Sequence, residues 1–315
     1  MSRLNICFSS DDAYAQYLAA AMVSILRNTN REIRFYILTS FLSEENRNKL
    51  ESLKSIGSFE LEFLNINSEE FNNLPNKIAH LNLYTYYRFK IATLLSDLDK
   101  VLYLDCDIIS IDDISKLYDI NICEYYVAAA EDITSIPRKA RLGTGNYINA
   151  GVLLLNLDLL RRDGVEDKLF QYAAQNKNKI ELGDQDVINY VMAERIKLLP
   201  DIYNYQYATP LSLTNVTKPE YARKAPEGIV LLHYAGGKKP WNTTEVRWKY
   251  AKEYWANHAL TPWGAHYRRP PRPLLLAREL IWGFVRNFKY IVLRLLSLTG
   301  TETYLRKLQG RKQQI

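Results

Sequence analysis

The sequence lacks the features that mark disulfide-rich and repeat proteins. Its 315 residues include only three cysteines, Cys7, Cys106 and Cys123, and none belongs to a C-x-x-C pair. Three cysteines cannot form a closed set of disulfides, so a reducing compartment is expected. The first apolar run stops at Asp11 and Asp12 and is too short for a signal peptide. No internal repeat is present, and we expect a cytoplasmic protein.

An excess of positive over negative charge is also absent from most of the chain, although the net charge is +6. Residues 266–315 hold 11 lysines and arginines against two acidic residues, whereas the rest holds 30 against 33. An enzyme acting on nucleic acid would carry its positive charge around the catalytic domain. No nucleic-acid partner is therefore expected, and the basic character belongs to the tail.

Short apolar segments alternate with helical patterns along the chain. Strands are predicted at residues 4–9, 33–39, 59–66, 101–104, 126–130, 152–155 and 229–232. Helices are predicted at residues 14–27, 43–53, 82–95, 165–175, 183–192 and 247–256, and loops at residues 138–147 and 234–241. This alternation predicts an α/β fold with a largely parallel sheet and right-handed crossovers.

Two carboxylates end the short apolar segment 101–104. Asp105 and Asp107 are two residues apart, so in extended backbone they project to the same face. They repel each other unless a cation lies between them, and oxygen ligands suit magnesium, calcium and manganese. The carboxyl ends of strands are also where open α/β sheets bind ligands. The pattern indicates a metal-nucleotide site, unless Asp107 only caps a turn.

Three further polar residues are candidates for ligand contacts, each with a structural alternative. Asp11 ends the first strand and could accept the N–H of a uracil ring, or Asp11 or Asp12 could cap the next helix. Arg88 could pair with a phosphate or carboxylate, or be a solvated helix charge. Asn149, in the segment Asn149-Ala-Gly151, could bond sugar hydroxyls or serve a tight turn.

Asp184, Gln185 and Asp186 begin a predicted helix. Acidic side chains there complement the helix dipole, which explains the two aspartates structurally. The dipole does not explain Gln185, which is therefore a candidate for contact with a substrate.

His233 ends the last predicted strand and is followed by Gly236, Gly237, Lys239 and Trp241. A histidine in this place is either a structural residue or a nitrogen ligand for the cation at the strand-end carboxylates. A mixed oxygen and imidazole site favours manganese over magnesium. Lys239 could then hold a diphosphate as a point charge. The glycines allow close backbone approach, and the Trp241 ring could serve as a flat cover.

These segments together resemble glycosyltransferase family 8, in particular the bacterial lipopolysaccharide and lipooligosaccharide galactosyl- and glucosyltransferases. The resemblance covers residues 4–241. Six motifs occur in the family's order: Ser10-Asp-Asp12, Thr85-Tyr-Tyr-Arg88, Val101-Leu-Tyr-Leu-Asp-Cys-Asp107, Asn149-Ala-Gly151, Asp184-Gln-Asp186 and His233-Tyr-x-Gly236-x-x-Lys239-Pro-Trp241. One departure is Ala13, where members of the family can carry Asn near the uridine.

The resemblance implies a GT-A fold, a UDP-sugar donor, a manganese ion and retention of the anomeric configuration. The implied metal ligands are Asp105, Asp107 and His233. Asp11 is implied to contact uracil, and Gly236 and Lys239 to hold the diphosphate. The implied contacts to the donor sugar are Arg88, Asn149, Asp184 and Gln185, with Asp132 towards the acceptor. Gln185 is the nearest candidate for the β face of the sugar.

The predicted function is the transfer of galactose or glucose from UDP-galactose or UDP-glucose to a bacterial glycan, such as a lipid-linked core oligosaccharide. Manganese is the expected metal, with magnesium as an alternative. Three other functions remain open: transfer to a protein acceptor, hydrolysis of the UDP-sugar, and binding without turnover. Hydrolysis without acceptor, at the rate seen with acceptor, would favour the hydrolase.

The chain is predicted to divide into a catalytic domain (residues 1–260), a proline-rich linker (261–273) and a basic tail (274–315). Residues 274–298 are apolar-rich but carry five charges, which argues against a bilayer-crossing helix. Those charges fall within an arc of about 160° on a helix, opposite an apolar stripe. Such a helix lies on an anionic membrane surface, or its stripe packs on the catalytic domain or a second subunit.

Overall fold

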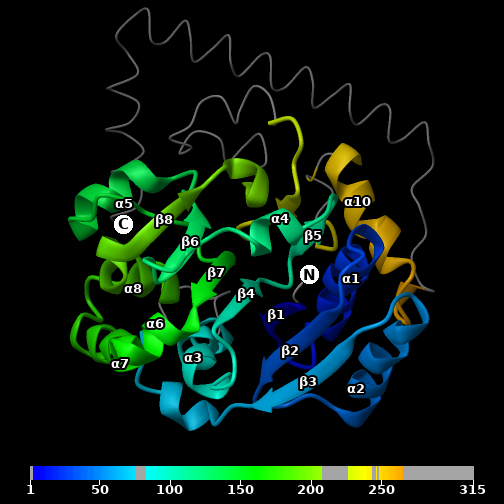
Figure 1. The fold of residues 1–315 in the computed structure, drawn as a ribbon, viewed down its shortest axis with the longest axis horizontal. Helices are drawn as coiled ribbons and strands as arrows, with labels where there is room; N and C mark the ends of the chain where they lie inside the picture. The colour runs from blue at the N-terminus through cyan, green and yellow to red at the C-terminus, as the bar shows by residue number, and fades with distance from the viewer. Residues whose placement is uncertain (1–2, 76–82, 208–225, 243–245, 247, 265–315) are drawn as a thin grey trace, which may run out of the picture. The chain divides into compact units, whose positions relative to one another are not determined.

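The computed structural model describes residues 3–75, 83–207, 226–242, 246 and 248–264 (Figure 1). In this part of the chain the main sheet has seven strands in the order β3-β2-β1-β4-β7-β6-β8. Its strands are β1 (Leu4–Ser9), β2 (Ile33–Thr39), β3 (Glu60–Asn65), β4 (Lys100–Leu104), β6 (Val127–Ala130), β7 (Val152–Asn156) and β8 (Ile196–Leu199). β7 runs antiparallel to both β4 and β6, and the other pairs are parallel. The sheet is therefore mixed.

Helices cover both faces of this sheet because its strands are apolar on both sides. On β4, Leu102 and Leu104 belong to one core, and Val101 and Tyr103 belong to the other. The first core contains residues of α1 (Ala15–Asn28), α2 (Glu44–Glu51) and α4 (Ser115–Tyr118). The second contains residues of α3 (Ile91–Leu94), α6 (Leu157–Arg162), α7 (Val165–Gln175) and α8 (Asp184–Val191).

A second, three-stranded sheet was not predicted. It has the order β5-β10-β9, with β5 (Ile108–Ser110), β10 (Leu231–His233) and β9 (Tyr205–Gln206). β5 starts directly after Asp107 and pairs antiparallel with β10. A small core packs this sheet against α10 (Trp248–His258), which lies beside α1 (Figure 1).

The prediction of a loop at residues 138–147 is wrong for the first half of this segment. Residues there form α5 (Ser135–Leu142), which ends at Gly143 in the left-handed conformation with φ +70°. A glycine with positive φ is the usual residue after the end of a helix. Gly143 therefore marks a helix end, and the following residues up to 147 are non-helical. The predicted helix at 82–95 is a 3-10 helix (Leu83–Lys90) followed by the short α3.

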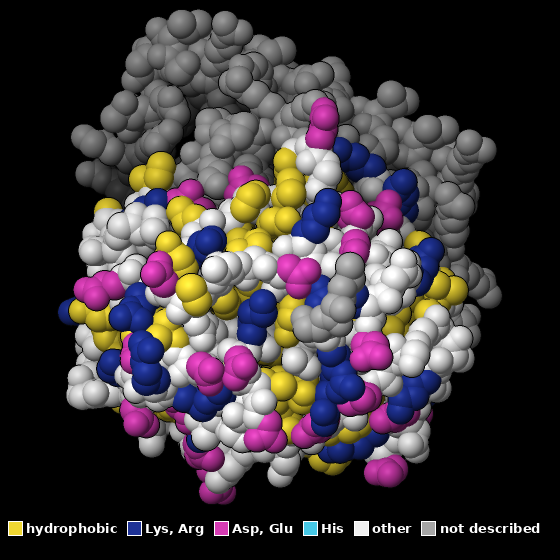
Figure 2. All heavy atoms as spheres, in the orientation of Figure 1, with side chains coloured by type: hydrophobic (Ala, Val, Ile, Leu, Met, Phe, Trp, Pro, Cys, Tyr) yellow, Lys and Arg dark blue, Asp and Glu magenta, His cyan; other side chains and the backbone are white. Residues whose placement is uncertain are grey.

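Acidic and basic side chains are interspersed on the described part of the face seen in Figure 2. Oppositely charged side chains also pair across neighbouring strands, as Arg34 of β2 does with Glu62 of β3 at 2.7 Å. This distribution agrees with the near balance of charge outside the tail.

The predicted tail at residues 274–315, and the linker beyond residue 264, lie outside the described residues. By its internal contacts the chain divides into Met1–Tyr267 and Arg268–Ile315. No helix in the described ranges is long and apolar enough to cross a bilayer. The amphipathic tail helix and the three domain boundaries remain predictions.

Candidate active site

A cavity of about 480 Å³ opens at the carboxyl ends of β1 and β4. This is the size of a typical small-molecule site. Its lining includes every residue predicted for the site: Asp11, Arg88, Asp105, Asp107, Asp132, Asn149, Asp184, Gln185, His233, Gly236 and Lys239. Strand pairing brings together residues that lie more than 200 positions apart in the sequence.

Asp105, Asp107 and His233 each offer a ligand atom, and these atoms lie within 4.8 Å of one another. The pairing of β5 with β10 places His233 opposite Ile108. The backbone N–H of the next residue, Tyr234, donates to the carbonyl of Asp107 at 3.1 Å. The short second sheet is thus what carries the imidazole to the strand-end carboxylates.

Gly151 has no side chain, and this leaves room for His233 and Asp105 to approach each other. Its carbonyl accepts the N–H of Asp105 at 2.9 Å, continuing the β4–β7 pairing. A Cβ at Gly151 would lie 2.4 Å from Cε1 of His233 and 3.0 Å from Oδ2 of Asp105. Two carboxylates and one imidazole around this space are a set of ligands that fits manganese or magnesium.

Lys239 lies against this acidic cluster. Its ammonium donates to Oδ2 of Asp107 and to the carbonyl of Tyr234. Nε2 of His233 lies 3.4 Å from Oδ1 of Asp107. Burial acts to raise the pKa of Asp107, but Lys239 and His233 outweigh it and hold that pKa well below its usual value. Asp107 is therefore an ionised carboxylate in the neutral range.

Arg88 is buried, and its guanidinium bonds to three acceptors around the cavity. Its Nη2 donates to Oδ1 of Asp105 at 2.9 Å, Nη1 to the carbonyl of Ala150 at 2.5 Å, and Nε to the carbonyl of Thr85 at 2.8 Å. The guanidinium also lies over the ring of Tyr103, whose hydroxyl donates to the same Asp105 oxygen at 3.0 Å. Arg88 is therefore not a solvated helix charge, and together with Tyr103 it orients Asp105.

Asp184 has an oxygen without a hydrogen-bond donor among the described residues. Oδ2 lies 3.2 Å from Nε of Arg88, but that N–H is directed to the carbonyl of Thr85. Burial raises the pKa of Asp184 to about 6, although Arg88 acts in the opposite direction. Asp184 lines the cavity, and its carboxylate is a candidate to accept a hydroxyl of a bound molecule.

Replacing Asp184 by Asn is expected to stabilise the metal-free protein at about pH 7.5. A carboxyl pKa of about 6 rather than 3.8 corresponds to a cost of roughly 3 kcal/mol once the group is ionised. The stabilising contribution of the protonated group is present below pH 3.8 and is lost as pH rises through about 6. Thermal unfolding of both proteins should therefore show a gain for Asp184→Asn at pH 7.5 that shrinks towards pH 4. An equal midpoint at pH 7.5 would contradict the assignment.

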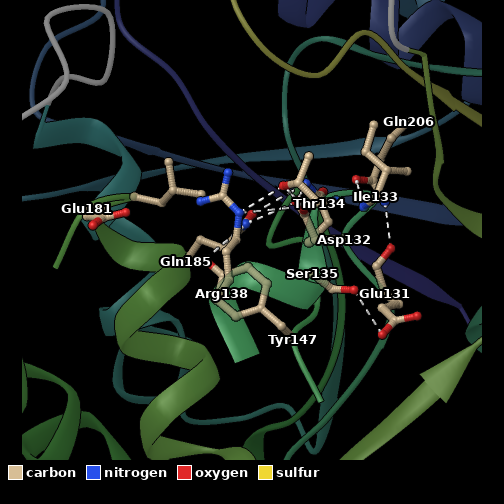
Figure 3. A network of polar contacts seen from close by, with 12 residues as sticks. Glu131, Asp132, Ile133, Thr134, Ser135, Arg138, Tyr147, Glu181, Gln185 and Gln206 are labelled. Carbon is tan, nitrogen blue, oxygen red and sulfur yellow. Dashed lines mark hydrogen bonds and ion pairs between the residues drawn. The ribbon is translucent and has the colours of Figure 1, made fainter. Parts of the chain in front are cut away.

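Asp132 lines the cavity and is the centre of a polar network (Figure 3). Its Oδ1 accepts from the backbone N–H of Thr134 at 2.8 Å and from the hydroxyl at 2.5 Å. Its Oδ2 accepts from Nε2 of Gln185 at 3.1 Å and from Nδ2 of Asn149 at 3.2 Å. Arg138 lies 4.0 Å away and comes from α5, the helix that sequence analysis missed. Thr134 and Arg138 also line the cavity.

Asp186 does not face the cavity. Its buried carboxylate accepts from Arg141 at 2.8 and 2.9 Å, from the Tyr147 hydroxyl at 2.5 Å, and from two backbone N–H groups of Glu181 and Leu182. Burial acts to raise the pKa of Asp186, but these hydrogen bonds hold it below its usual value. Asp186 therefore ties α8 to α5.

Asp11 caps the turn before α1, because its Oδ1 accepts the N–H of Tyr14 at 2.8 Å. Asp12 is used elsewhere and accepts from the Ser43 N–H at 2.7 Å. The N-cap of α1 is Tyr14, without a side-chain capping bond, so neither aspartate is the helix cap; Asp11 holds the preceding turn and lines the cavity. Sequence analysis missed Tyr14, a half-exposed ring beside Asp11 in the same lining. Its spacing of three residues from Asp11 is the signal that could have indicated it.

The glycine-rich loop at 234–241 begins its turn at Gly236, which has φ +81°. Trp241 does not cover the cavity, because its ring stacks on Tyr17 at 4.1 Å and packs against Tyr254 at 4.9 Å. This ring anchors the loop to α1 and α10. Asn242, which lines the cavity, closes the loop by accepting the N–H of Lys239 at 2.9 Å.

Comparison with known proteins places this site in a family. The model of glycosyl transferase family 8 matches residues 5–245. The chain belongs to this family. It is therefore a glycosyltransferase, as the six motifs indicated. A putative glycosyltransferase of Haemophilus influenzae is 31% identical over 246 residues, which are 76% of this chain and 73% of that protein.

Some relatives have names that state the sugar transferred and the linkage formed. The lipopolysaccharide 1,2-glucosyltransferase of Escherichia coli K12 is 25% identical and is matched over 91% of this chain and 90% of its own length. The lipopolysaccharide 1,3-galactosyltransferase of Salmonella typhimurium is 27% identical, over 76% of this chain and 74% of its own. Among solved structures, the galactosyltransferase LgtC with donor and acceptor sugar analogues superimposes with a TM-score of 0.73 at 28% identity. That match covers 86% of this chain and 98% of LgtC, which confirms the predicted GT-A fold.

Proposed function

We propose that this chain transfers a hexose, galactose or glucose, from a UDP-sugar to a bacterial surface glycan such as the lipopolysaccharide core. We further propose that it uses manganese and retains the anomeric configuration. The observation that carries the proposal is a cavity lined by the converging side chains of Asp105, Asp107 and His233 and by the buried residue Asp184. Two relatives are named as lipopolysaccharide glucosyl- and galactosyltransferases, which supports a lipopolysaccharide-type glycan as the acceptor.

The residues divide into a diphosphate end and a sugar end. Asp105, Asp107 and His233 would hold the cation, which supplies positive charge to the diphosphate of the leaving UDP. Lys239 and the flexible backbone at Gly236 would add to that charge stabilisation once the diphosphate binds. At the base, Asp11 would accept the uracil N–H and the Tyr14 ring would cover its face.

At the sugar end, Asp184 would accept a hydroxyl and Asn149 would bond another. Gln185 would lie at the β face, and Asp132 would lie towards the acceptor. The bond from C1 to the diphosphate breaks with its electron pair on UDP, and the acceptor hydroxyl attacks C1 from the same face. A phosphate oxygen of the departing UDP takes the hydroxyl proton. The sugar passes through an oxocarbenium-like state, as in glycoside hydrolysis.

The product is expected to keep the α-linkage of the donor. An inverting displacement needs a base on the face opposite the leaving diphosphate, and Asp186 cannot serve there because it does not face the cavity and is engaged by Arg141, Tyr147 and two backbone N–H groups. The linkage can be read from the anomeric coupling constant in the NMR spectrum of the product. A β-linked product from an α-linked donor would refute retention.

A panel of UDP-sugars with manganese and a mixed glycan acceptor tests the function itself. We expect one hexose to be added to the acceptor from UDP-galactose or UDP-glucose, measured as a product mass. Addition to a protein substrate instead would assign the other acceptor class. Release of free hexose at the same rate with and without acceptor would identify a hydrolase and contradict the proposal.

We propose that the protein acts at the cytoplasmic face of the cell membrane, where a lipid-linked acceptor is met. The chain ending at residue 267 is expected to keep UDP binding but to lose sedimentation with anionic vesicles. The reason is that all 11 lysines and arginines between residues 266 and 315 lie in the removed segment, and basic residues attract anionic lipid. Neutral vesicles are the control. If the full chain ignores anionic vesicles at low salt, or the shortened chain unfolds, the apolar stripe is an internal or subunit contact.

A further inference from the structure

Asn204 lies completely buried behind the cavity, at the start of β9. The parallel pairing of β9 with β10 holds it next to His233. Its Oδ1 lies 2.9 Å from Nδ1 of His233, and its Nδ2 donates to Oδ1 of Asn149 at 3.0 Å. One side-chain amide therefore joins a residue proposed to bind the cation with a residue proposed to bind the sugar.

The direction of each hydrogen bond in this chain can be worked out from its far end. The N–H of Gly151 can only donate, and it lies 3.0 Å from Oδ1 of Asn149. The Asn149 nitrogen in turn faces Oδ2 of Asp132 at 3.2 Å. The atom of Asn149 that faces Asn204 is therefore an oxygen, so Asn204 must present its NH₂ group there.

It follows that the oxygen of Asn204 faces His233. An oxygen accepts only from a protonated nitrogen, so Nδ1 of His233 carries the proton in the neutral ring. Nε2 then keeps its lone pair and faces Asp107 at 3.4 Å. A metal-binding histidine is usually fixed in this way, by donating its other ring N–H to a neighbouring acceptor.

We propose that Asn204 is a positioning residue that selects the His233 tautomer able to bind a cation through Nε2. The same amide orients Asn149 towards the donor sugar, so cation and sugar contacts depend on one side chain. The inference rests on the proposed function for its role in transfer, but the tautomer itself does not.

Asn189 shows what a buried structural amide looks like in the same protein. It is also completely buried, but it bonds only to backbone groups, the N–H and carbonyl of Ile148 and the carbonyl of Gln185. Asn204 instead has two side-chain partners, and both line the cavity. Asn189→Ala is therefore a control for the loss of a buried amide as such.

The first measurement is the tautomer of His233 in the metal-free full chain, by NMR of ¹⁵N-labelled histidine at about pH 8. Comparison with His233→Gln assigns the signal. We expect a proton on Nδ1 and a bare Nε2. A neutral ring with its proton on Nε2 and none on Nδ1 would overturn the proposal, whether or not the chain transfers sugar.

The second measurement is manganese affinity in the presence of UDP, for two variants of Asn204. Asn204→Ala removes both hydrogen bonds and should weaken manganese binding by about 10- to 100-fold. Asn204→Asp keeps an acceptor for the Nδ1–H but loses the donor to Asn149. It should therefore bind manganese within about 3-fold of the wild type, a difference below 1 kcal/mol, while kcat for transfer falls.

Asn189→Ala is the control, and three results would contradict the proposal or the metal site. Asn189→Ala should lower the unfolding temperature without weakening manganese binding. Wild-type affinity in Asn204→Ala, or equal weakening in Asn204→Asp and Asn204→Ala, would contradict the positioning role. Absence of manganese binding in the wild type would instead refute the proposed metal site, and the tautomer measurement would still decide the orientation of Asn204.

Discussion

Replacing Asp107 by Asn is expected to lower the rate of transfer by about 100- to 1,000-fold, the usual effect of losing one group that stabilises charge in a transition state. The change removes one of the three converging ligands and also leaves Lys239 and His233 without their common anionic partner. Manganese binding should weaken together with the rate, because the same carboxylate serves both. Asp105→Asn and His233→Ala should act in the same direction.

The matched control is Asp112→Asn, which alters an exposed carboxylate just beyond β5. Rates with saturating UDP-sugar, and manganese affinity by titration calorimetry, should be unchanged in this control. Unchanged activity in all three ligand variants would contradict the site assignment. Full activity of the wild type in excess chelator would do the same.

Replacing Gly151 by Ala is expected to have an effect of similar size without touching a ligand. The new Cβ would lie 2.4 Å from Cε1 of His233 and 3.0 Å from Oδ2 of Asp105, distances that force one or both groups to move. Since His233 is held by strand pairing and by Asn204, the displacement should separate the ligand atoms. We expect transfer and manganese affinity each to fall by about 100-fold.

Gly145→Ala is the control for this variant, because a Cβ there meets nothing within 4 Å. Circular dichroism and thermal unfolding should show that both variants remain folded. If Gly151→Ala bound manganese and transferred sugar as the wild type does, the close approach of Asp105 and His233 at this glycine would not matter for function.

The carboxylates and most strands could be predicted because their signals are local. The apolar segment 101–104 is a buried strand, and alternation along β4 sends Tyr103 and Asp105 to the same side. Several of the predicted boundaries differ from the observed ones by one or two residues, as at β6 and α8. A resemblance carried by six ordered motifs then indicated the cavity residues, which the structure brings together.

What sequence could not supply was the set of short, non-local contacts. β5 and β9 have three and two residues, too few to show a periodic pattern, yet their pairing with β10, the strand predicted at His233, places His233 and Asn204. Helix α5 was missed because two glycines follow its last turn and suggested a loop. Asn204 is a single buried amide with no motif around it, and only its two partners reveal a role.

The proposed use of Arg88 changed once its contacts were known. Its residue type left it either as a ligand for phosphate or carboxylate or as a solvated charge, and the resemblance implied a contact to the donor sugar. In the structure all three of its nitrogens bond to protein acceptors, one of them Asp105. The buried guanidinium rules out the solvated charge and helps to position that carboxylate, whereas the contact to the donor sugar stays a prediction.

The central claim is that Asp105, Asp107 and His233 hold a divalent cation at the diphosphate end of the cavity. Anomalous diffraction near the manganese absorption edge, from crystals of the full chain grown with manganese and UDP, tests it most directly. We expect one strong peak within ligand distance of all three side chains, with the diphosphate beside it. UDP bound in the cavity without a peak among these residues, or with the peak elsewhere, would contradict the account.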